Sequence, residues 1–344
     1  MYKYWLISDR DNNGIGTERN KDGLTYWVSD TAPLNDIKNW KSVSHDEFKT
    51  LLAGAADTFD ALPQGENEDQ SHVSILIHGF NESFDHSTSF YQDFCGRLFD
   101  GENSMGMCIL YDWPSLGTVV GYEPDRASAR DCAGDLTDIL SELFDWLLVK
   151  QQAAINSKGD TNQACKAKVS VIAHSMGNYV LQKAMAAAWT RKNQPLLVSL
   201  INQLVMVAAD VDNDLFDVGA PDNNDGSAVA DLTYRITALY SGRDAVLGAS
   251  AGLKHFGTRR LGRSGLAHRP PLVSGPPATD NVWDVDCSSF FAPDVSGMNI
   301  HGAYFVTDGT IDLIRRILCG IDRTILQANG LTKGAASPDP SARS

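Results

Sequence analysis

The sequence is short of basic residues and of long apolar runs. It has 29 Lys and Arg residues against 43 Asp and Glu residues, which gives a formal net charge of −14. Nucleic acids and anionic membranes bind basic surfaces, so this charge argues against both as partners. No stretch approaches the roughly 18 consecutive apolar residues of a membrane span, and the N-terminal residues lack the pattern of a signal peptide. We therefore expect a cytoplasmic protein without a membrane span.

Paired cysteines are absent as well. The six cysteines lie far apart and form no CxxC motif, so the sequence indicates neither a disulfide scaffold nor a zinc site. We predict no metal and no organic cofactor.

Buried strands alternate with amphipathic helices along most of the chain. Five nearly continuous apolar runs each end in polar or glycine-bearing residues: VSILIHGF, MCILYDWP, KVSVIAHS, QLVMVAAD and YRITALYS. Such runs are typical of strands buried on both faces. Helical spacing of apolar residues between the runs predicts an α/β fold with a mostly parallel sheet flanked by helices. The segments YKYWLIS and LTYWVS, joined by turn-forming residues, predict an N-terminal hairpin.

Two segments depart from this pattern. Residues 245–282 are rich in Gly and Pro and basic, which predicts a large, lid-like loop inserted in one domain over residues 1–328. Residues 329–344 are small and polar, and we expect a disordered tail.

The stretch AHSMGN at residues 173–178 has the pattern of a nucleophile elbow. It follows the strand-like run KVSVI and precedes an apolar helical face. A serine on this strand-to-helix turn needs small neighbours, which Ala173 and Gly177 provide. We therefore predict Ser175 as a nucleophile. His174 is too close to Ser175 on the turn to act as its base.

A serine nucleophile needs a histidine base and a carboxylate that orients the base. Of the histidines after the elbow, His255 and His268 lie in the basic insertion, whereas His301 lies on a loop before a C-terminal helical pattern. We predict His301 as the base. Asp244 and Asp210 each follow a strand and compete as the acid. We prefer Asp244, because Asp210 also resembles the capped start of a short helix.

The loop after VSILI is the predicted source of an oxyanion hole. In HGFN, the Phe80 N–H and the Met176 N–H after the nucleophile are expected to bind the same oxygen. His78 is expected to hold this loop by a hydrogen bond. Trp113 and Tyr122 either line an acyl-binding pocket or only pack their own loop onto the sheet.

The basic insertion has two open interpretations. Arg259 and Arg260 either recognise an anionic group on the substrate or belong to a solvated loop that balances the acidic surface.

The ordered motifs HGFN, YDWPS, YEPDRASA, AHSMGN, AADVD, LYSGRDA and NIHGAYF, from about residue 70 to 320, resemble the bacterial α/β-hydrolase family catalogued as domain of unknown function 900. The resemblance implies an α/β-hydrolase fold, with Ser175 as nucleophile, Asp244 as acid and His301 as base. It also implies hydrolysis of carboxylic esters, with a small-molecule ester or acyl compound as substrate. An acyltransferase, a thioesterase or an amidase would use the same residues, and a non-catalytic binding protein would keep the fold alone.

Overall fold

The computed structural model describes residues 2–59, 71–115, 122–156, 167–192, 199–254, 257–267 and 281–330. Its contacts divide the chain into two compact units, Met1–Ile172 and Ala173–Ser344. The predicted loop histidines His255 and His268 lie outside the described residues. So do residues 331–344 of the expected tail, and the prediction of one domain over residues 1–328 stays a prediction.

Nine strands in the described part of the chain form a mostly parallel sheet, as the sequence predicts. Unit 1 contains the order β3-β2-β1-β5-β4, unit 2 contains β7-β8-β9, and β6 spans the boundary between the units. The strands are β1 (Tyr4–Ser8), β2 (Thr25–Ser29), β3 (Lys41–Val43), β4 (His72–Ile77), β5 (Gly106–Asp112), β6 (Lys168–His174), β7 (Ile201–Val207), β8 (Thr233–Tyr240) and β9 (Val282–Asp286).

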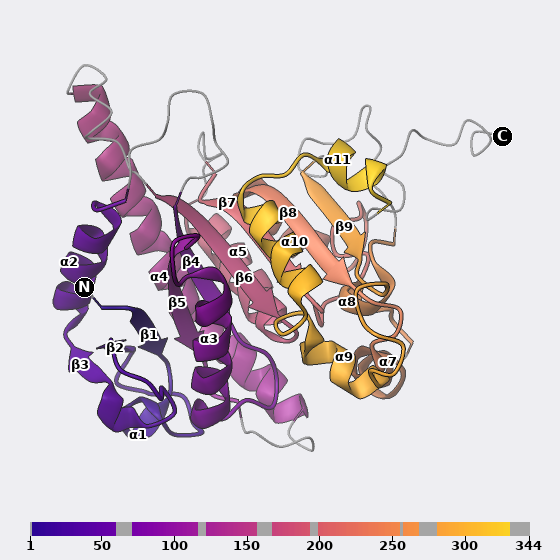
Figure 1. The fold of residues 1–344 in the computed structure, drawn as a ribbon, viewed down its shortest axis with the longest axis horizontal. Helices are drawn as coiled ribbons and strands as arrows, with labels where there is room; N and C mark the ends of the chain where they lie inside the picture. Colours follow the sequence, from indigo (N-terminus) through magenta and orange to yellow (C-terminus); the bar gives the residue numbers. More distant parts are fainter. Residues whose placement is uncertain are drawn as a thin grey trace. The chain divides into compact units, whose positions relative to one another are not determined.

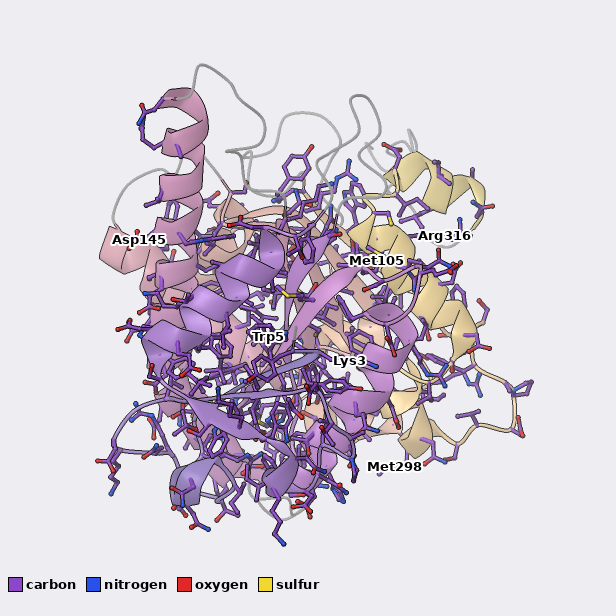
Figure 2. All side chains as sticks on the ribbon, turned by 60° about the vertical axis from the view of Figure 1, so that its left-hand side comes forward. Lys3, Trp5, Met105, Asp145, Met298 and Arg316 are labelled. Atoms are coloured by element: carbon purple, nitrogen blue, oxygen red, sulfur yellow. The ribbon has the colours of Figure 1, made fainter. Side chains whose placement is uncertain are left out.

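The N-terminal hairpin is confirmed, and it is part of the sheet of unit 1. β1 pairs antiparallel with β2 and parallel with β5. β1 has a strand on each side, and all five of its residues are buried. Trp5 is 1% exposed and lies among the side chains of this unit (Figure 2). The short strand β3 pairs with β2 and exposes Lys41, which is typical of a protected sheet edge.

Helices flank the sheet in unit 1. They are α1 (Asp11–Gly14), the 3₁₀ helix η1 (Ile37–Asn39), α2 (His45–Ala56), α3 (Phe84–Leu98) and α4 (Tyr122–Asn156). Serine caps start two of them: Ser44 accepts a hydrogen bond from Glu47 N in α2, and Ser83 accepts one from His86 N in α3. Helix α3 packs on β5, where the Tyr91 hydroxyl donates to Cys108 O at 2.6 Å.

Unit 2 has helices on its three complete strands. They are α5 (Gly177–Lys192), α6 (Asn223–Asp231), α7 (Ala245–Ala249), the π-helix η4 (Ser250–Lys254), α8 (Leu261–Ser264), α9 (Gly297–Ala303), α10 (Asp308–Leu318) and α11 (Arg323–Ala328). Helix α10 lies along β7 and β8 in Figure 1 and packs on β7. Its apolar stripe is buried, whereas Arg316 on the opposite side pairs with Asp312 and is exposed (Figure 2).

The segment predicted as one large loop over 245–282 contains the three short helices α7, η4 and α8 within its described residues, so that prediction is wrong there. Helix α8 packs on β8. Its residue Gly262 approaches the end of β7 so closely that a Cβ atom would lie 2.1 Å from the carbonyl carbon of Ala208. The glycine that suggested a loop therefore permits close packing.

None of the helices in the described ranges is both long and apolar enough to span a membrane.

Candidate active site

Ser175 lies at the turn between β6 and α5 in a left-handed conformation, with φ of 50°. The end of β7 holds this turn. Ser175 N donates to Val207 O at 3.0 Å, and Asp210 N donates to Ser175 O at 3.1 Å. The buried Asn178 side chain also donates to Ser175 O, at 3.2 Å. Several hydrogen bonds thus fix a backbone conformation that is unfavourable for serine.

His301 bridges Ser175 and Asp244. Its Nε2 lies 2.8 Å from Ser175 Oγ, and its Nδ1 lies 2.7 Å from Asp244 Oδ2. Ser175 is 3% exposed, Asp244 is fully buried and the His301 side chain is 14% exposed. The structure therefore brings the predicted nucleophile, base and acid into one chain of hydrogen bonds, with the imidazole reachable from solvent.

Asp244 has two roles in the structure. Its Oδ1 accepts from Leu247 N at 3.0 Å and caps helix α7, while Oδ2 contacts His301. The Arg263 guanidinium donates to Asp244 O. A helix cap and a histidine partner are compatible here because one carboxylate has two oxygens.

His301 lies within helix α9, so its expected place on a loop is wrong. The helix starts after Ser296 and ends at Ala303, and its buried residues include Ile300. The helix could not be predicted from the stretch SGMNIHGAYF, because its glycines weaken the apolar periodicity that indicates a helix.

Asp210, the alternative acid, contacts a different partner. Its Oδ1 accepts from Arg260 Nε at 2.7 Å and from Ser250 Oγ at 2.9 Å. Arg260 also donates to Asp210 O at 2.6 Å and pairs with Asp212. Arg260 is fully buried, so it neutralises these carboxylates, and the interpretation that it recognises a substrate anion is wrong for this residue. Arg259 is exposed.

His174 packs beside the site, as expected from its position. Its ring centroid lies 4.9 Å from that of His301, and its Nε2 lies 2.9 Å from His301 O. The Phe305 ring also contacts the His174 ring edge-on, at 5.3 Å. The imidazole of His174 thus supports the position of helix α9.

Met176 and Phe80, the predicted oxyanion donors, belong to different units. Met176 is buried directly before α5 in unit 2. Phe80 lies in the turn after β4 in unit 1, where its ring contacts Tyr122 edge-on at 5.6 Å. Their joint role stays a prediction.

Buried polar groups hold the turn that contains Phe80. Ser115 Oγ accepts from Asn81 N at 2.8 Å and donates to the buried Asp125 at 2.6 Å. His78 Nδ1 lies 2.9 Å from Gly79 O, and its Nε2 lies 2.9 Å from Asp112 Oδ1. These contacts agree with the expectation that His78 supports the loop.

Asp112 is a buried carboxylate that contacts both Arg10 and His78 near the turn that contains Phe80. Arg10 Nε contacts it at 2.9 Å, and both side chains are fully buried. Burial alone would raise the pKa of Asp112, but the charge of Arg10 and the hydrogen bond with His78 lower it to about 2. Arg10 also donates to Glu82 O at 2.8 Å, so a residue of the hairpin stabilises the turn after β4.

Trp113 is fully buried, stacks on His78 at 5.3 Å and donates to His78 O at 2.9 Å. These contacts favour the packing alternative for Trp113. Tyr122 is 6% exposed, and its place in a substrate pocket stays a prediction.

Sequence reasoning missed Arg243, and it gave Arg260 either a substrate-binding role or a place in a solvated loop. Arg243 donates to the backbone of the segment after β9, Arg260 donates to Asp210 after β7, and Arg263 donates to Asp244 O after β8. For Arg260 and Arg263, the only local signal was the lack of acidic residues from Ala245 to Thr279. Among the described residues, no group of three or more His, Cys, Asp or Glu side chains is arranged to hold a metal ion.

A family model described as "Alpha/beta hydrolase of unknown function (DUF900)" matches residues 61–286. This match covers the elbow and Asp244, while β1, β2 and His301 lie outside it. No curated protein matches the chain.

Proposed function

Because the chain belongs to the α/β-hydrolase family of unknown function DUF900, we propose that it is a serine hydrolase that cleaves carboxylic esters. One observation carries the proposal. Ser175 has φ of 50° at a strand-to-helix turn, and its Oγ begins a chain of hydrogen bonds of 2.8 and 2.7 Å through His301 to Asp244. This is the arrangement that activates a serine hydroxyl.

In the proposed reaction, His301 Nε2 takes the hydroxyl proton while Ser175 Oγ attacks the ester carbonyl carbon. The bond to the leaving alkoxide then breaks, and the imidazolium gives its proton to that oxygen. Asp244 accepts the Nδ1 hydrogen of His301, fixes its tautomer and stabilises the imidazolium. Water, deprotonated by His301, next attacks the acyl-enzyme and releases the acid and free Ser175.

The negative oxygen of the intermediate needs hydrogen-bond donors. We assign the Met176 N–H to this role, because it lies at the start of α5, where amide groups have no acceptor in a preceding turn and the helix dipole favours an anion. The Phe80 N–H is the proposed second donor. Loss of one such donor typically costs about 3 kcal/mol of transition-state stabilisation, about a hundredfold in rate.

The test is labelling with a fluorophosphonate probe, which reacts with activated serines. We expect the wild type to label and Ser175→Ala not to label. Ser264→Ala, which changes an exposed serine in α8, is the matched control and should label like the wild type. A wild type that does not label, or an alanine variant at 175 that labels equally, would refute the proposal. An ester, a thioester and an anilide of one acyl chain then identify the preferred bond.

A further inference from the structure

The Arg243 side chain lies in a ring of backbone carbonyls. Nη1 donates to Phe291 O at 2.8 Å and to Ser288 O at 3.3 Å. Nη2 donates to three further carbonyl oxygens at 2.9 to 3.3 Å: Ala292 O, Pro293 O and Val295 O. A planar guanidinium offers several hydrogens in fixed directions, which suits it to hold several carbonyls at once.

These carbonyls belong to the segment 287–296, which leads from β9 into helix α9 and therefore to His301. Arg243 itself directly precedes Asp244 in the turn between β8 and α7. Ser288 adds to the connection, since its Oγ lies 3.1 Å from Ser241 Oγ and accepts from Gly242 N at 3.2 Å. Hydrogen bonds thus connect the turn that contains Asp244 to the segment that leads to His301.

Helix α9 also starts in direct contact with this turn. A Cβ atom on Gly297 would lie 2.9 Å from Arg243 O and 2.9 Å from Ala245 Cβ. The first residue of α9 therefore has to be glycine for the helix to approach Asp244 this closely. Both the side chain and the backbone of Arg243 determine where α9 begins.

We propose that Arg243 is a positioning residue that holds His301 at hydrogen-bonding distance from Asp244. The inference rests on the proposed function. The imidazole is joined to Asp244 by one bond of 2.7 Å, and one bond does not fix the direction of a helix. Small displacements of a catalytic base reduce the rate strongly, because the reacting groups must keep both their distance and their angle.

The proposal makes a specific prediction for Arg243→Lys. The ammonium keeps the charge but cannot reproduce five carbonyl contacts, so α9 becomes less firmly held. With p-nitrophenyl acetate, we expect kcat to fall about 30-fold or more, while KM changes by less than about 3-fold. Asp244 stabilises the imidazolium, so a looser contact favours the neutral imidazole. The acid limb of the kcat/KM profile should therefore shift to lower pH by about half a unit or more.

Arg235→Lys is the matched control. Arg235 also donates to backbone carbonyls, Gly320 O at 2.7 Å and Ile321 O at 3.3 Å, but it lies near the start of β8, at the opposite end of that strand from Asp244. We expect Arg235→Lys to lower Tm by about as much as Arg243→Lys does. Unlike Arg243→Lys, it should leave the pH profile of kcat/KM unchanged. Rates are expressed per active site titrated with the fluorophosphonate, so unfolded protein does not contribute.

Gly297→Ala provides a second, independent variant if Arg243→Lys folds poorly. It keeps the guanidinium and displaces the start of α9, so we expect the same fall in kcat and the same direction of shift in the acid limb. Unchanged kcat and pH profiles in both variants, with Ser175→Ala inactive, would overturn the positioning role alone. Activity that survives in Ser175→Ala would instead refute the proposed function.

Discussion

At the scale of single residues, two carboxylates follow neighbouring strands and have different partners. Asp244 contacts His301 at 2.7 Å, whereas Asp210 contacts the buried Arg260 at 2.7 Å. Asp210 Oδ1 accepts from Arg260 and Ser250, whereas Asp244 Oδ2 contacts the imidazole that in turn contacts Ser175 Oγ. The two residues differ in their partners and not in their position after a strand. For this reason the residues alone left both as candidates for the acid that orients His301.

Replacing each carboxylate by its amide separates the two roles. In Asp244→Asn, the side-chain oxygen can still cap Leu247, but His301 loses the acceptor that orients its proton. We expect kcat to fall by about 10⁴-fold with little change in Tm. In Asp210→Asn, the amide weakens a buried ion pair, and we expect a loss of about 2 kcal/mol in the free energy of unfolding with kcat within several-fold of wild type.

Steady-state kinetics and urea unfolding of the two variants check this prediction. Loss of activity in Asp210→Asn alone, with unchanged unfolding, would reverse the assignment of the acid.

At the scale of elements, the short helices of residues 245–267 depend on contacts that are distant in sequence. The Cβ position of Gly262 in α8 lies 2.1 Å from the Ala208 carbonyl carbon, whereas that of Gly252 in η4 has no neighbour within 4 Å. In Gly262→Ala, the added methyl group forces α8 away from the end of β7. We expect the free energy of unfolding to fall by about 2–4 kcal/mol.

Gly252→Ala is the matched control for this substitution. Its new methyl group meets open space, so we expect a change of less than about 1 kcal/mol. Urea unfolding followed by circular dichroism measures both variants. Equal stability of the two would contradict the close packing of α8.

The same contrast between local and distant contacts explains what the sequence could predict. Strands β4 to β8 are apolar runs, and the stripe of α10 repeats with helical spacing, so both follow from local pattern. The edge strands β3 and β9 are short and were missed. The helices in residues 245–267 were missed too, because they depend on distant contacts. Arg260, for example, donates to Asp210, which lies 50 positions earlier.

The candidate site divides in the same way. Ser175 is signalled by its own strand-to-helix context, and the order of acid and base follows from the resemblance to a family. Arg243 has no such signal, since its partners lie 45 to 52 positions later. Supporting residues of this kind become visible only when the chain is folded.

At the scale of the whole molecule, buried carboxylates determine how stability depends on pH. Asp9 is fully buried after β1, with Asp135, Cys132, Arg19 and Tyr111 as its charged or titratable neighbours. Burial, followed by the charge of Asp135, raises its pKa to about 7. The charge of Arg10 and the hydrogen bond with His78 outweigh burial at Asp112 and lower its pKa to about 2.

The two shifts act in opposite directions and in different pH ranges. Between pH about 4 and about 7, folded Asp9 holds a proton that the unfolded chain has released, so stability decreases as pH rises through this range. Between pH about 2 and about 4, Asp112 is ionised in the folded state but protonated in the unfolded chain. Its contribution to the free energy of unfolding is therefore fully present above pH about 4 and is lost as pH falls towards 2.

Asp9→Asn tests the larger of these effects. The amide can still accept the hydrogen bond that the Tyr111 hydroxyl donates to Asp9 at 3.3 Å, but it carries no charge to desolvate. We expect the free energy of unfolding at pH 8 to rise by up to about 4 kcal/mol and its decline between pH 4 and 7 to flatten. Asp100→Asn is the control. Asp100 is exposed, and the hydrogen bond from Lys3 lowers its pKa, so its titration does not contribute to the slope between pH 4 and 7. Urea unfolding at intervals of half a pH unit measures the slope, and an unchanged slope in Asp9→Asn would show that Asp9 is ionised throughout.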